Sequence, residues 1–244
     1  MLEDLKPHIA ELRDRLIKII AALLVAFMVC FYFWEPIQNW ISAPLRDALN
    51  ENGVVMAYKM GEKFFTAAMV SFFTALLVSL PIVFYQIWAF VSPGLYSSEK
   101  RFVLPFTIGA TFMFLIGSAF AYYLVFPYGF TYLVNFGEND VVSQISIGEY
   151  LGFFIKLIFG FGLSFELPVV CFFLAKIGLI DDSSLKGFFR YAVVIIFILA
   201  AILTPPDVIS QFFMALPMIF LYGVSILIVK LVNPAQEAKK EEKS

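Results

Sequence analysis

Six long apolar segments constrain this chain more than any other feature of its sequence. A hydrocarbon core about 30 Å thick needs about 20 helical residues to cross it. The chain is 61% hydrophobic and 15% charged, whereas soluble domains have about 45–50% apolar and about 25% charged residues. We therefore predict an all-α, polytopic membrane protein with six transmembrane helices. The predicted spans lie near residues 16–34, 64–90, 102–127, 150–176, 188–204 and 208–229.

The domain organisation follows from the same pattern. No soluble domain interrupts the spans, so we expect residues 1–230 to form a single six-helix transmembrane domain. Residues 231–244 are polar and charged, which is typical of a disordered tail. The first 20 residues are charged and amphipathic and do not resemble a cleavable signal peptide, so the first span is expected to be retained.

Prolines and charges predict the shape of individual helices. Proline removes a backbone hydrogen bond and tends to kink a helix. Four prolines lie within the spans, namely Pro81, Pro105, Pro168 and Pro217. In the fifth span, only 16 residues separate Arg190 from Asp207, which corresponds to about 24 Å of helix. We therefore expect helices five and six to be short and joined by an outer turn of Pro205, Pro206 and Asp207, in which Asp207 can cap the sixth helix.

The distribution of lysine and arginine predicts the orientation, because cytoplasmic loops carry an excess of these residues. One set of loops, together with both ends of the chain, holds Lys6, Arg13, Arg15, Lys18, Lys100, Arg101, Lys176, Lys186, Arg190, Lys230, Lys239, Lys240 and Lys243. The opposite set holds Arg46, Lys59 and Lys63. Both termini and the loop at 91–101 are therefore predicted to be cytoplasmic.

The sequence offers no candidate for catalysis, a cofactor or a metal. A hydrolase needs a nucleophile and a base, yet the only histidine is His8 at the N-terminal surface. Cys30 and Cys171 fall within apolar spans, where a small buried hydrophobic residue is the ordinary interpretation. No phosphate-binding loop is present. The net charge of −2 argues against a nucleic-acid partner.

Two acidic residues near the predicted cytoplasmic surface each allow two interpretations. Glu11 is placed to pair with Arg15 one helical turn later, worth about 0.2–0.5 kcal/mol. Glu99 follows a helix break at Ser92-Pro93-Gly94, and in the first turn of the third span it would stabilise the helix dipole by about 0.3–1 kcal/mol. Either carboxylate could instead bind a cationic partner.

Three further polar residues lie within or between the later spans. Glu166 is deep inside the fourth span, where an ionisable group costs about 2.5–3.5 kcal/mol or more. It is either a neutral group bonded to a neighbouring helix or part of a transport path, where Gly162 would leave space for water. Thr204 and Gln211 could satisfy each other or the adjacent turn, or could hydrogen-bond to another helix.

Several short motifs resemble the successive signature segments of one family. They are HIAELRDRL at 8–16, ISAPL at 41–45, FVSPGLYSSEKR at 90–101, FPYGF at 126–130, SFELP at 164–168 and LTPPDVISQ at 203–211. In this order and spacing they resemble TatC, the core subunit of the twin-arginine protein translocase, over about residues 8–230.

The resemblance implies a receptor rather than an enzyme. It implies that the cytoplasmic surface binds the paired arginines of signal peptides on folded cargo. By motif position, Glu99 is the main acid and Glu11 its neighbour, with Leu12 and Arg13 in the same segment. The motifs also contain the structural loop residues Pro44, Pro93 and Gly94. This sequence departs from the family where Ser97 and Ser98 replace a base or histidine that often precedes the loop acid.

The resemblance also implies partners, an energy source and a location. The partners are the single-span TatA and TatB proteins, with self-association in an oligomeric receptor complex, and the transmembrane proton gradient drives transport. The location is the plasma (inner) membrane of a bacterium or archaeon. Thr204 and Gln211 match a region that docks TatA or TatB, and Glu166 matches an embedded acid. The alternative function is a proton-coupled small-solute transporter that uses Glu166, although the paired broken helices of such transporters are not evident here.

Overall fold

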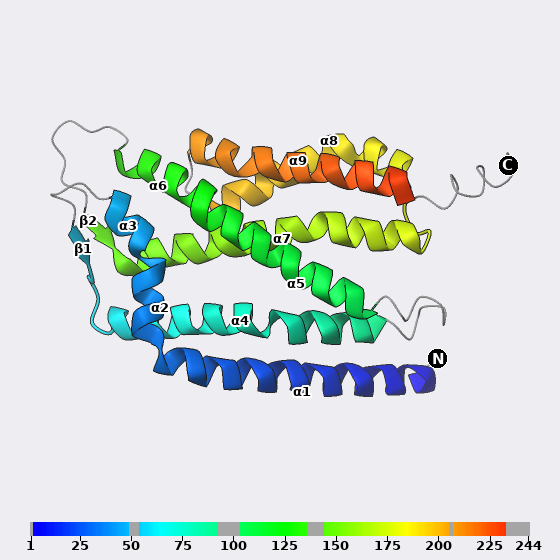
Figure 1. The fold of residues 1–244 in the computed structure, drawn as a ribbon, viewed down its shortest axis with the longest axis horizontal. Coiled ribbons are helices and arrows are strands. Elements are labelled where there is room, and N and C mark those ends of the chain that lie inside the picture. Colours follow the sequence, from blue (N-terminus) through cyan, green and yellow to red (C-terminus); the bar gives the residue numbers. More distant parts are fainter. Residues whose placement is uncertain (1, 49–53, 92–102, 136–143, 205–206, 233–244) are drawn as a thin grey trace, which may run out of the picture. The chain divides into compact units, whose positions relative to one another are not determined.

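The protein, seen in a computed structural model, is described over residues 2–48, 54–91, 103–135, 144–204 and 207–232 (Figure 1). Within these ranges, six helices are long and apolar enough to cross a membrane. They are His8–Tyr32, Glu62–Phe90, Val103–Leu133, Ile147–Lys176, Asp182–Leu203 and Val208–Val232. The predicted all-α fold with six membrane-spanning helices is therefore confirmed.

The chain divides into two compact units, which we describe separately. The first comprises Met1–Phe112 and Asp140–Gly152, and the second comprises Met113–Asn139 and Phe153–Ser244. The boundary passes through two helices, so each unit contains part of the third and part of the fourth span.

The first unit is built on two long helices, α1 (Leu2–Tyr32) and α4 (Glu62–Val91), which lie side by side (Figure 1). Two short helices, α2 (Trp34–Ile41) and α3 (Ala43–Ala48), follow α1. Pro36 and Pro44 lie in the first turns of these short helices, where the missing N–H would have no acceptor in any case. Prolines at these positions therefore help the chain to begin new helices beyond the end of α1.

A small sheet joins distant parts of the first unit. Strand β1 (Val54–Met56) pairs in parallel with β2 (Gln144–Ser146), and Val55 lies opposite Ile145. The helix α7 (Ile147–Lys176) begins directly after β2. The Tyr150 hydroxyl, in the first turns of α7, donates to the carbonyl of Ile41 at 2.8 Å. The sheet and this hydrogen bond attach the start of the fourth span to the segment between the first and second spans.

The second unit combines the rest of α5 (Val103–Phe120) and α7 with α6 (Phe126–Asn135), α8 (Asp182–Leu203) and α9 (Val208–Val232). Helices α8 and α9 pack against each other as a hairpin. Buried aromatic side chains fill the space around α7, including Phe114, Phe126, Phe154 and Phe161.

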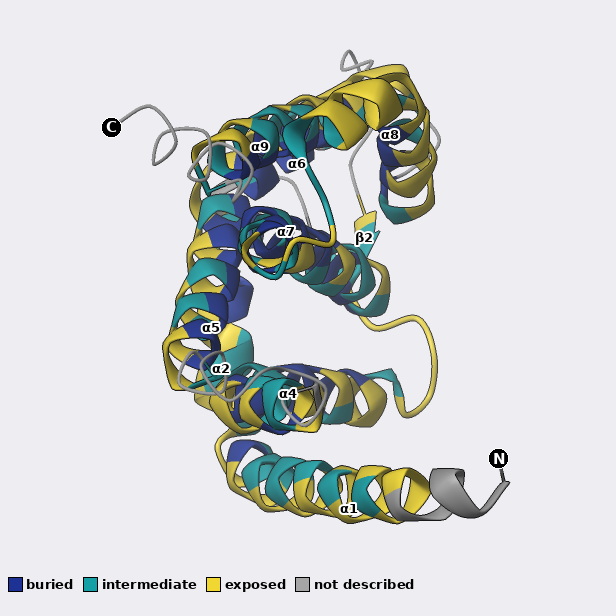
Figure 2. Ribbon diagram, turned by 90° about the vertical axis from the view of Figure 1, so that its right-hand side faces the viewer, coloured by how far each residue is buried: buried dark blue, intermediate teal, exposed yellow. Residues whose placement is uncertain are grey.

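The burial of the spans divides them into core and lipid-facing helices. More than half of the apolar window of α7 is buried (56%), against 6% for α1 and 17% for α8. Figure 2 shows the corresponding exposed residues along α1 and α8. Because the exposed side chains are largely apolar, these surfaces suit contact with lipid.

Close approach of α5 and α7 in the second unit depends on two glycines. A Cβ atom at Gly117 would lie 2.7 Å from the backbone oxygen of Phe161, and one at Gly162 would lie 2.5 Å from the ring of Phe114. The space that we expected Gly162 to leave for water is therefore filled by the Phe114 ring. In a membrane, small residues of this kind let two helix backbones approach closely.

The third span contains a feature that the sequence analysis missed. Between α5 and α6, residues Ala121–Val125 form a π-helical turn, and the Phe126 N–H donates to the Ala121 carbonyl five residues earlier. Pro127 follows at once and has no N–H to donate. The wider turn therefore coincides with the position where proline would interrupt a regular helix.

The four expected prolines behave differently from one another. Pro81, Pro168 and Pro217 lie inside α4, α7 and α9, which continue through them as single helices. Kinks at these three positions stay a prediction. Pro105 is the third residue of α5 as the structure describes it, and within that helix it interrupts no hydrogen bond, because first-turn N–H groups have no intrahelical acceptor.

We expected helices five and six to be short, but neither α8 nor α9 is a short helix. Helix α8 has 22 residues and begins at Asp182 rather than near 188, which gives about 33 Å. Its first turn is polar, and the Asp181 carboxylate caps it by accepting the Ser184 N–H at 2.7 Å. Helix α9 has 25 residues. Only the uncharged part of α8, from Tyr191 onward, is short.

Candidate functional site

A polar cluster lies near the N-terminal end of α1, where Glu11, Arg15 and Gln86 meet. Arg15 Nε and Nη2 donate to Glu11 Oε1 at 3.0 and 2.5 Å. Arg15 Nη1 donates to Gln86 Oε1 of α4 at 3.3 Å. The helical spacing of four residues brings Glu11 and Arg15 together, as expected from the sequence. The contact with Gln86 was not predicted, because it joins positions 71 residues apart.

The cluster has an accessible side. The side chain of Glu11 is 31% exposed and that of Arg15 is 20% exposed. Both Arg15 contacts go to Oε1 of Glu11, and Oε2 accepts no hydrogen bond from another residue in the described part of the chain. A further guanidinium could therefore approach Oε2, or could displace Arg15 from Oε1.

The neighbouring residues of the motif face outward. Leu12 is 49% exposed, and Arg13 pairs with Asp14 at 3.1 Å on an open surface. Glu99, together with Pro93 and Gly94, lies outside the described residues. The structure thus places Glu11, Leu12 and Arg13 on one helix.

Glu166 lies in α7 within the second unit and is 8% exposed. Its Oε1 atom has no hydrogen-bond partner among the described residues. The carboxyl group lies within hydrogen-bond reach of the Phe114 backbone in α5. Glu166 lies one turn after Gly162, at which α7 contacts the Phe114 ring of α5 closely. A buried polar atom without a partner is costly, and such atoms in a native structure call for an explanation.

The hairpin of α8 and α9 satisfies its own polar groups. Thr204 is buried and its hydroxyl donates to the Ala200 carbonyl at 2.9 Å. Gln211 Nε2 donates to the Phe197 carbonyl at 2.9 Å. Thr204 and Gln211 therefore bond to carbonyl groups of α8 and not to each other.

The turn before α9 is capped as the sequence predicted. Asp207 Oδ1 accepts the Ser210 N–H at 2.8 Å, and Oδ2 accepts the Ser210 hydroxyl. A carboxylate in this position satisfies backbone donors that the helix cannot. Pro205 and Pro206 lie outside the described residues.

Glu62 forms the largest polar contact set that the sequence analysis missed. Its Oε2 accepts the N–H groups of Tyr58 and Lys59 at 2.6 and 3.0 Å. Its Oε1 accepts the Ser146 hydroxyl at 2.5 Å and the Gly148 N–H at 3.1 Å. One carboxylate thereby joins the segment before α4 to the start of α7. The sequence did contain a local signal for the cap, because an acidic residue often lies in the first turn of a helix. The partners at 146 and 148 could not be predicted in this way, since they are distant in sequence.

Within the described ranges, no group of three His, Cys, Asp or Glu side chains could hold a metal ion.

The chain matches the family described as "Sec-independent protein translocase protein (TatC)" over residues 7–217. It belongs to the TatC family. Relatives named Sec-independent protein translocase protein TatC are similar along nearly the whole chain. That of Helicobacter pylori (strain ATCC 700392 / 26695) is 51% identical, covering 96% of this chain and 90% of the relative. That of Campylobacter jejuni is 50% identical, covering 99% and 100%, and that of Escherichia coli K12 is 37% identical, covering 92% and 88%.

Solved structures agree with this assignment. A crystal structure of the twin arginine translocase receptor TatC has a TM-score of 0.84 and 34% identity, and the match covers 92% of this chain and 99% of that one. The chain is therefore a TatC subunit of the Sec-independent, twin-arginine protein translocase and a multi-pass membrane protein. Membership of a family of translocase components points to a protein that is not an enzyme. The small-solute transporter that we considered as an alternative finds no support in these comparisons.

Proposed function

We propose that this TatC subunit is the receptor for twin-arginine signal peptides, and that Glu11 and Glu99 bind the two arginines. The observation that carries the proposal is the cluster of Glu11, Arg15 and Gln86. It presents a partly exposed carboxylate whose orientation is held by a neighbouring arginine and, through it, by α4. A carboxylate held in this way can accept two parallel hydrogen bonds from a planar guanidinium. A lysine ammonium fits this bidentate arrangement less well.

The cluster suggests a division of labour between the two acids. Glu11 already shares its Oε1 with Arg15, so an incoming arginine gains less there than at a carboxylate without a competing cation. By its position in the motif, we propose that Glu99 supplies the stronger contact. Leu12, exposed next to Glu11, offers an apolar surface for the peptide beside its arginines.

The test is binding of a twin-arginine peptide to purified protein carrying Glu99→Gln or Glu11→Gln. We expect Glu99→Gln to cost about 1.5–3 kcal/mol of binding free energy, as for a charge-assisted hydrogen bond. Glu11→Gln should weaken binding about two- to fivefold. Asp14→Asn, on the same helix, is the matched control and should leave affinity unchanged. Lower thermal stability with unchanged peptide affinity would mean that the acids only stabilise their helices.

We also propose that both termini and the loop at 91–101 lie in the cytoplasm, in the inner membrane of a bacterium or archaeon. The excess of lysine and arginine on that side supports this orientation. The same proposal includes one transmembrane domain over 1–230 and a disordered tail over 231–244.

The orientation can be tested by labelling. Cysteines introduced at positions 50 and 140 should react with an impermeant thiol reagent in intact cells, and one at position 240 should not. The reverse pattern would overturn both the orientation and the receptor surface.

Partner docking is proposed for the α8–α9 hairpin. TatA or TatB would contact it near Thr204 and Gln211. Copies of this chain would also assemble into an oligomeric receptor complex, and the proton gradient would drive transport. Gln211 uses one amide N–H within the hairpin, which leaves its Oε1 as an acceptor for another helix. Disulfide scanning from cysteines at 204 and 211 to the partner's single span tests this. Absence of crosslinks at both positions would exclude the hairpin as the docking site.

A further inference from the structure

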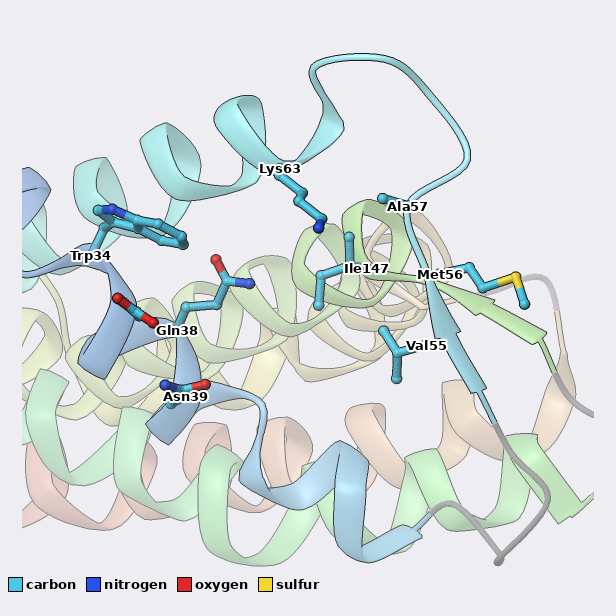
Figure 3. A pocket seen from close by; sticks show the side chains of 9 residues that line it. Trp34, Gln38, Asn39, Val55, Met56, Ala57, Lys63 and Ile147 are labelled. Carbon is cyan, nitrogen blue, oxygen red and sulfur yellow. The ribbon is translucent and has the colours of Figure 1, made fainter.

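A pocket of about 320 Å³ lies in the first unit, where α2, β1 and the beginnings of α4 and α7 meet (Figure 3). Helix α1 ends at Tyr32 and α4 begins at Glu62, so the pocket lies at the ends of two membrane spans. Tryptophans are enriched at this level of a membrane, and Trp34 is part of the wall. The lining residues are Trp34, Glu35, Gln38, Asn39, Val55, Met56, Ala57, Lys63 and Ile147.

The polar part of the wall holds both signs of charge. Lys63 and Glu35 both line the pocket, and neither side chain has an ion pair or a hydrogen bond with another residue that the structure describes. Asn39 differs, because its Oδ1 accepts from Arg46 Nη2 at 2.7 Å. The pocket thus presents a cation and an anion that are available to a ligand.

Gln38 adds an acceptor to this pair. Its Oε1 atom is buried and has no donor among the described residues. In Figure 3 the Gln38 amide and the Lys63 ammonium point into the same space. A buried acceptor without a donor costs free energy that a ligand bearing an N–H or O–H group would recover.

We propose that this pocket binds the headgroup of phosphatidylethanolamine. The phosphate lies against the Lys63 ammonium, and the primary ammonium of the lipid donates to the Glu35 carboxylate and, once the Gln38 amide turns its oxygen into the pocket, to Gln38 Oε1. The volume is at the low end for a small-molecule site, which suits a headgroup rather than a whole lipid. The acyl chains would follow the apolar surface beside it, where Phe64, next to Lys63, is 62% exposed.

The same groups argue against other common lipids. The quaternary ammonium of phosphatidylcholine has no N–H, so it leaves Gln38 Oε1 without a donor. Phosphatidylglycerol carries no cation for Glu35, and its net negative charge would lie near that carboxylate. Inorganic phosphate would pair with Lys63 but carries no cation for Glu35, and its negative charge would lie near that carboxylate. A ligand with both a phosphate and a primary ammonium matches all three side chains.

The test uses delipidated full-length protein in detergent. Phosphatidylethanolamine, phosphatidylcholine and phosphatidylglycerol with identical acyl chains are titrated, and bound lipid is counted by native mass spectrometry. We expect preferential binding of phosphatidylethanolamine. Lys63→Gln, Glu35→Gln and Gln38→Leu should each weaken it about three- to fivefold, as for partly exposed charged contacts. Lys59→Gln removes a nearby lysine that does not line the pocket, and it should change nothing.

Competition distinguishes a lipid site from a simple anion site. Soluble phosphoethanolamine should displace the lipid, whereas inorganic phosphate at the same concentration should not. Equal displacement by phosphate, equal binding of phosphatidylglycerol, or binding unaffected by the three pocket variants would each overturn the proposal. Twin-arginine peptide binding should be unchanged in these variants, so the outcome is independent of the receptor function.

Discussion

Two glutamates near or within the spans, Glu62 and Glu166, have opposite surroundings. The Glu62 carboxylate accepts four hydrogen bonds, three from backbone N–H groups and one from the Ser146 hydroxyl. Glu166 is 8% exposed, and its Oε1 has no partner in the described part of the chain. The difference follows from their places in the helices. Glu62 is at the first residue of α4, close to chain that offers free N–H groups, whereas Glu166 is in mid-helix, where N–H groups already bond to carbonyls.

The contrast separates a structural acid from a candidate functional one. A carboxylate with all its acceptors used holds two segments together and contributes to stability. A buried carboxylate with an unused acceptor costs stability and is retained in native proteins mostly where a function needs it. We therefore propose that Glu62 orders the end of the first unit, and that Glu166 keeps a locally thinned patch open where partner helices insert during cargo passage.

The largest effect should come from breaking the packing that surrounds Glu166. Gly117→Val introduces a Cβ that would lie 2.7 Å from the Phe161 backbone oxygen, so the helices must separate. We expect a loss of about 1–3 kcal/mol or more of stability, as for overpacked cores. Thermal unfolding in detergent measures it. Gly109→Val in the same helix is the matched control, because a Cβ at Gly109 meets nothing within 4 Å. Equal stability of both variants would show that α5 and α7 are not in tight contact at Gly117.

The next effect concerns transport. Glu166→Ala should reduce cargo export about tenfold at normal protein level, with Glu166→Gln intermediate because its amide stays polar. Stability of Glu166→Ala should be equal or higher by up to about 1–3 kcal/mol, because a buried acceptor without a partner is removed. Export, protein level and thermal unfolding are measured together. Normal export by Glu166→Ala at a normal protein level would end the transport hypothesis, and reduced stability would then assign Glu166 a packing role.

A smaller, local effect is expected at Glu62. Glu62→Gln keeps one acceptor oxygen and turns an N–H₂ group toward donors, so two of the present hydrogen bonds are lost. Amide hydrogen exchange should become faster at Tyr58, Lys59 and Gly148 while the spans stay protected. Glu149→Gln, an exposed acid two residues after the β2–α7 junction, is the control. Unchanged exchange at all three amides would show that the Glu62 carboxylate does not order this region.

The smallest effect is a pH dependence at the start of α8. The hydroxyl and the backbone N–H of Ser184, with the hydroxyl of Ser183, lower the pKa of Asp181 below its ordinary value of 3.8. Because the folded state favours the charged form, this stabilisation is present above pH 3.8 and is lost as the pH falls through the lower folded-state pKa. The difference in thermal stability between the natural protein and Asp181→Asn should therefore shrink at low pH. A difference that does not vary with pH would exclude this contribution.

Local patterns in the sequence determined much of this protein. Six spans follow from hydropathy, because a helix in lipid must satisfy its backbone internally and present apolar side chains. The pairing of Glu11 with Arg15 and the capping of α9 by Asp207 also follow from spacings of three or four residues. The motif segments were sufficient to indicate the TatC family, which the comparisons then established.

Only the tertiary structure decided which distant segments meet. The contacts of Arg15 with Gln86 and of Glu62 with Ser146 join positions 71 and 84 residues apart, and no local periodicity encodes them. The same holds for Gly117 and Gly162, which are close to a neighbouring helix while Gly152 meets nothing within 4 Å. Glycines look alike in sequence, and side-chain packing between helices determines which of them lies at a contact.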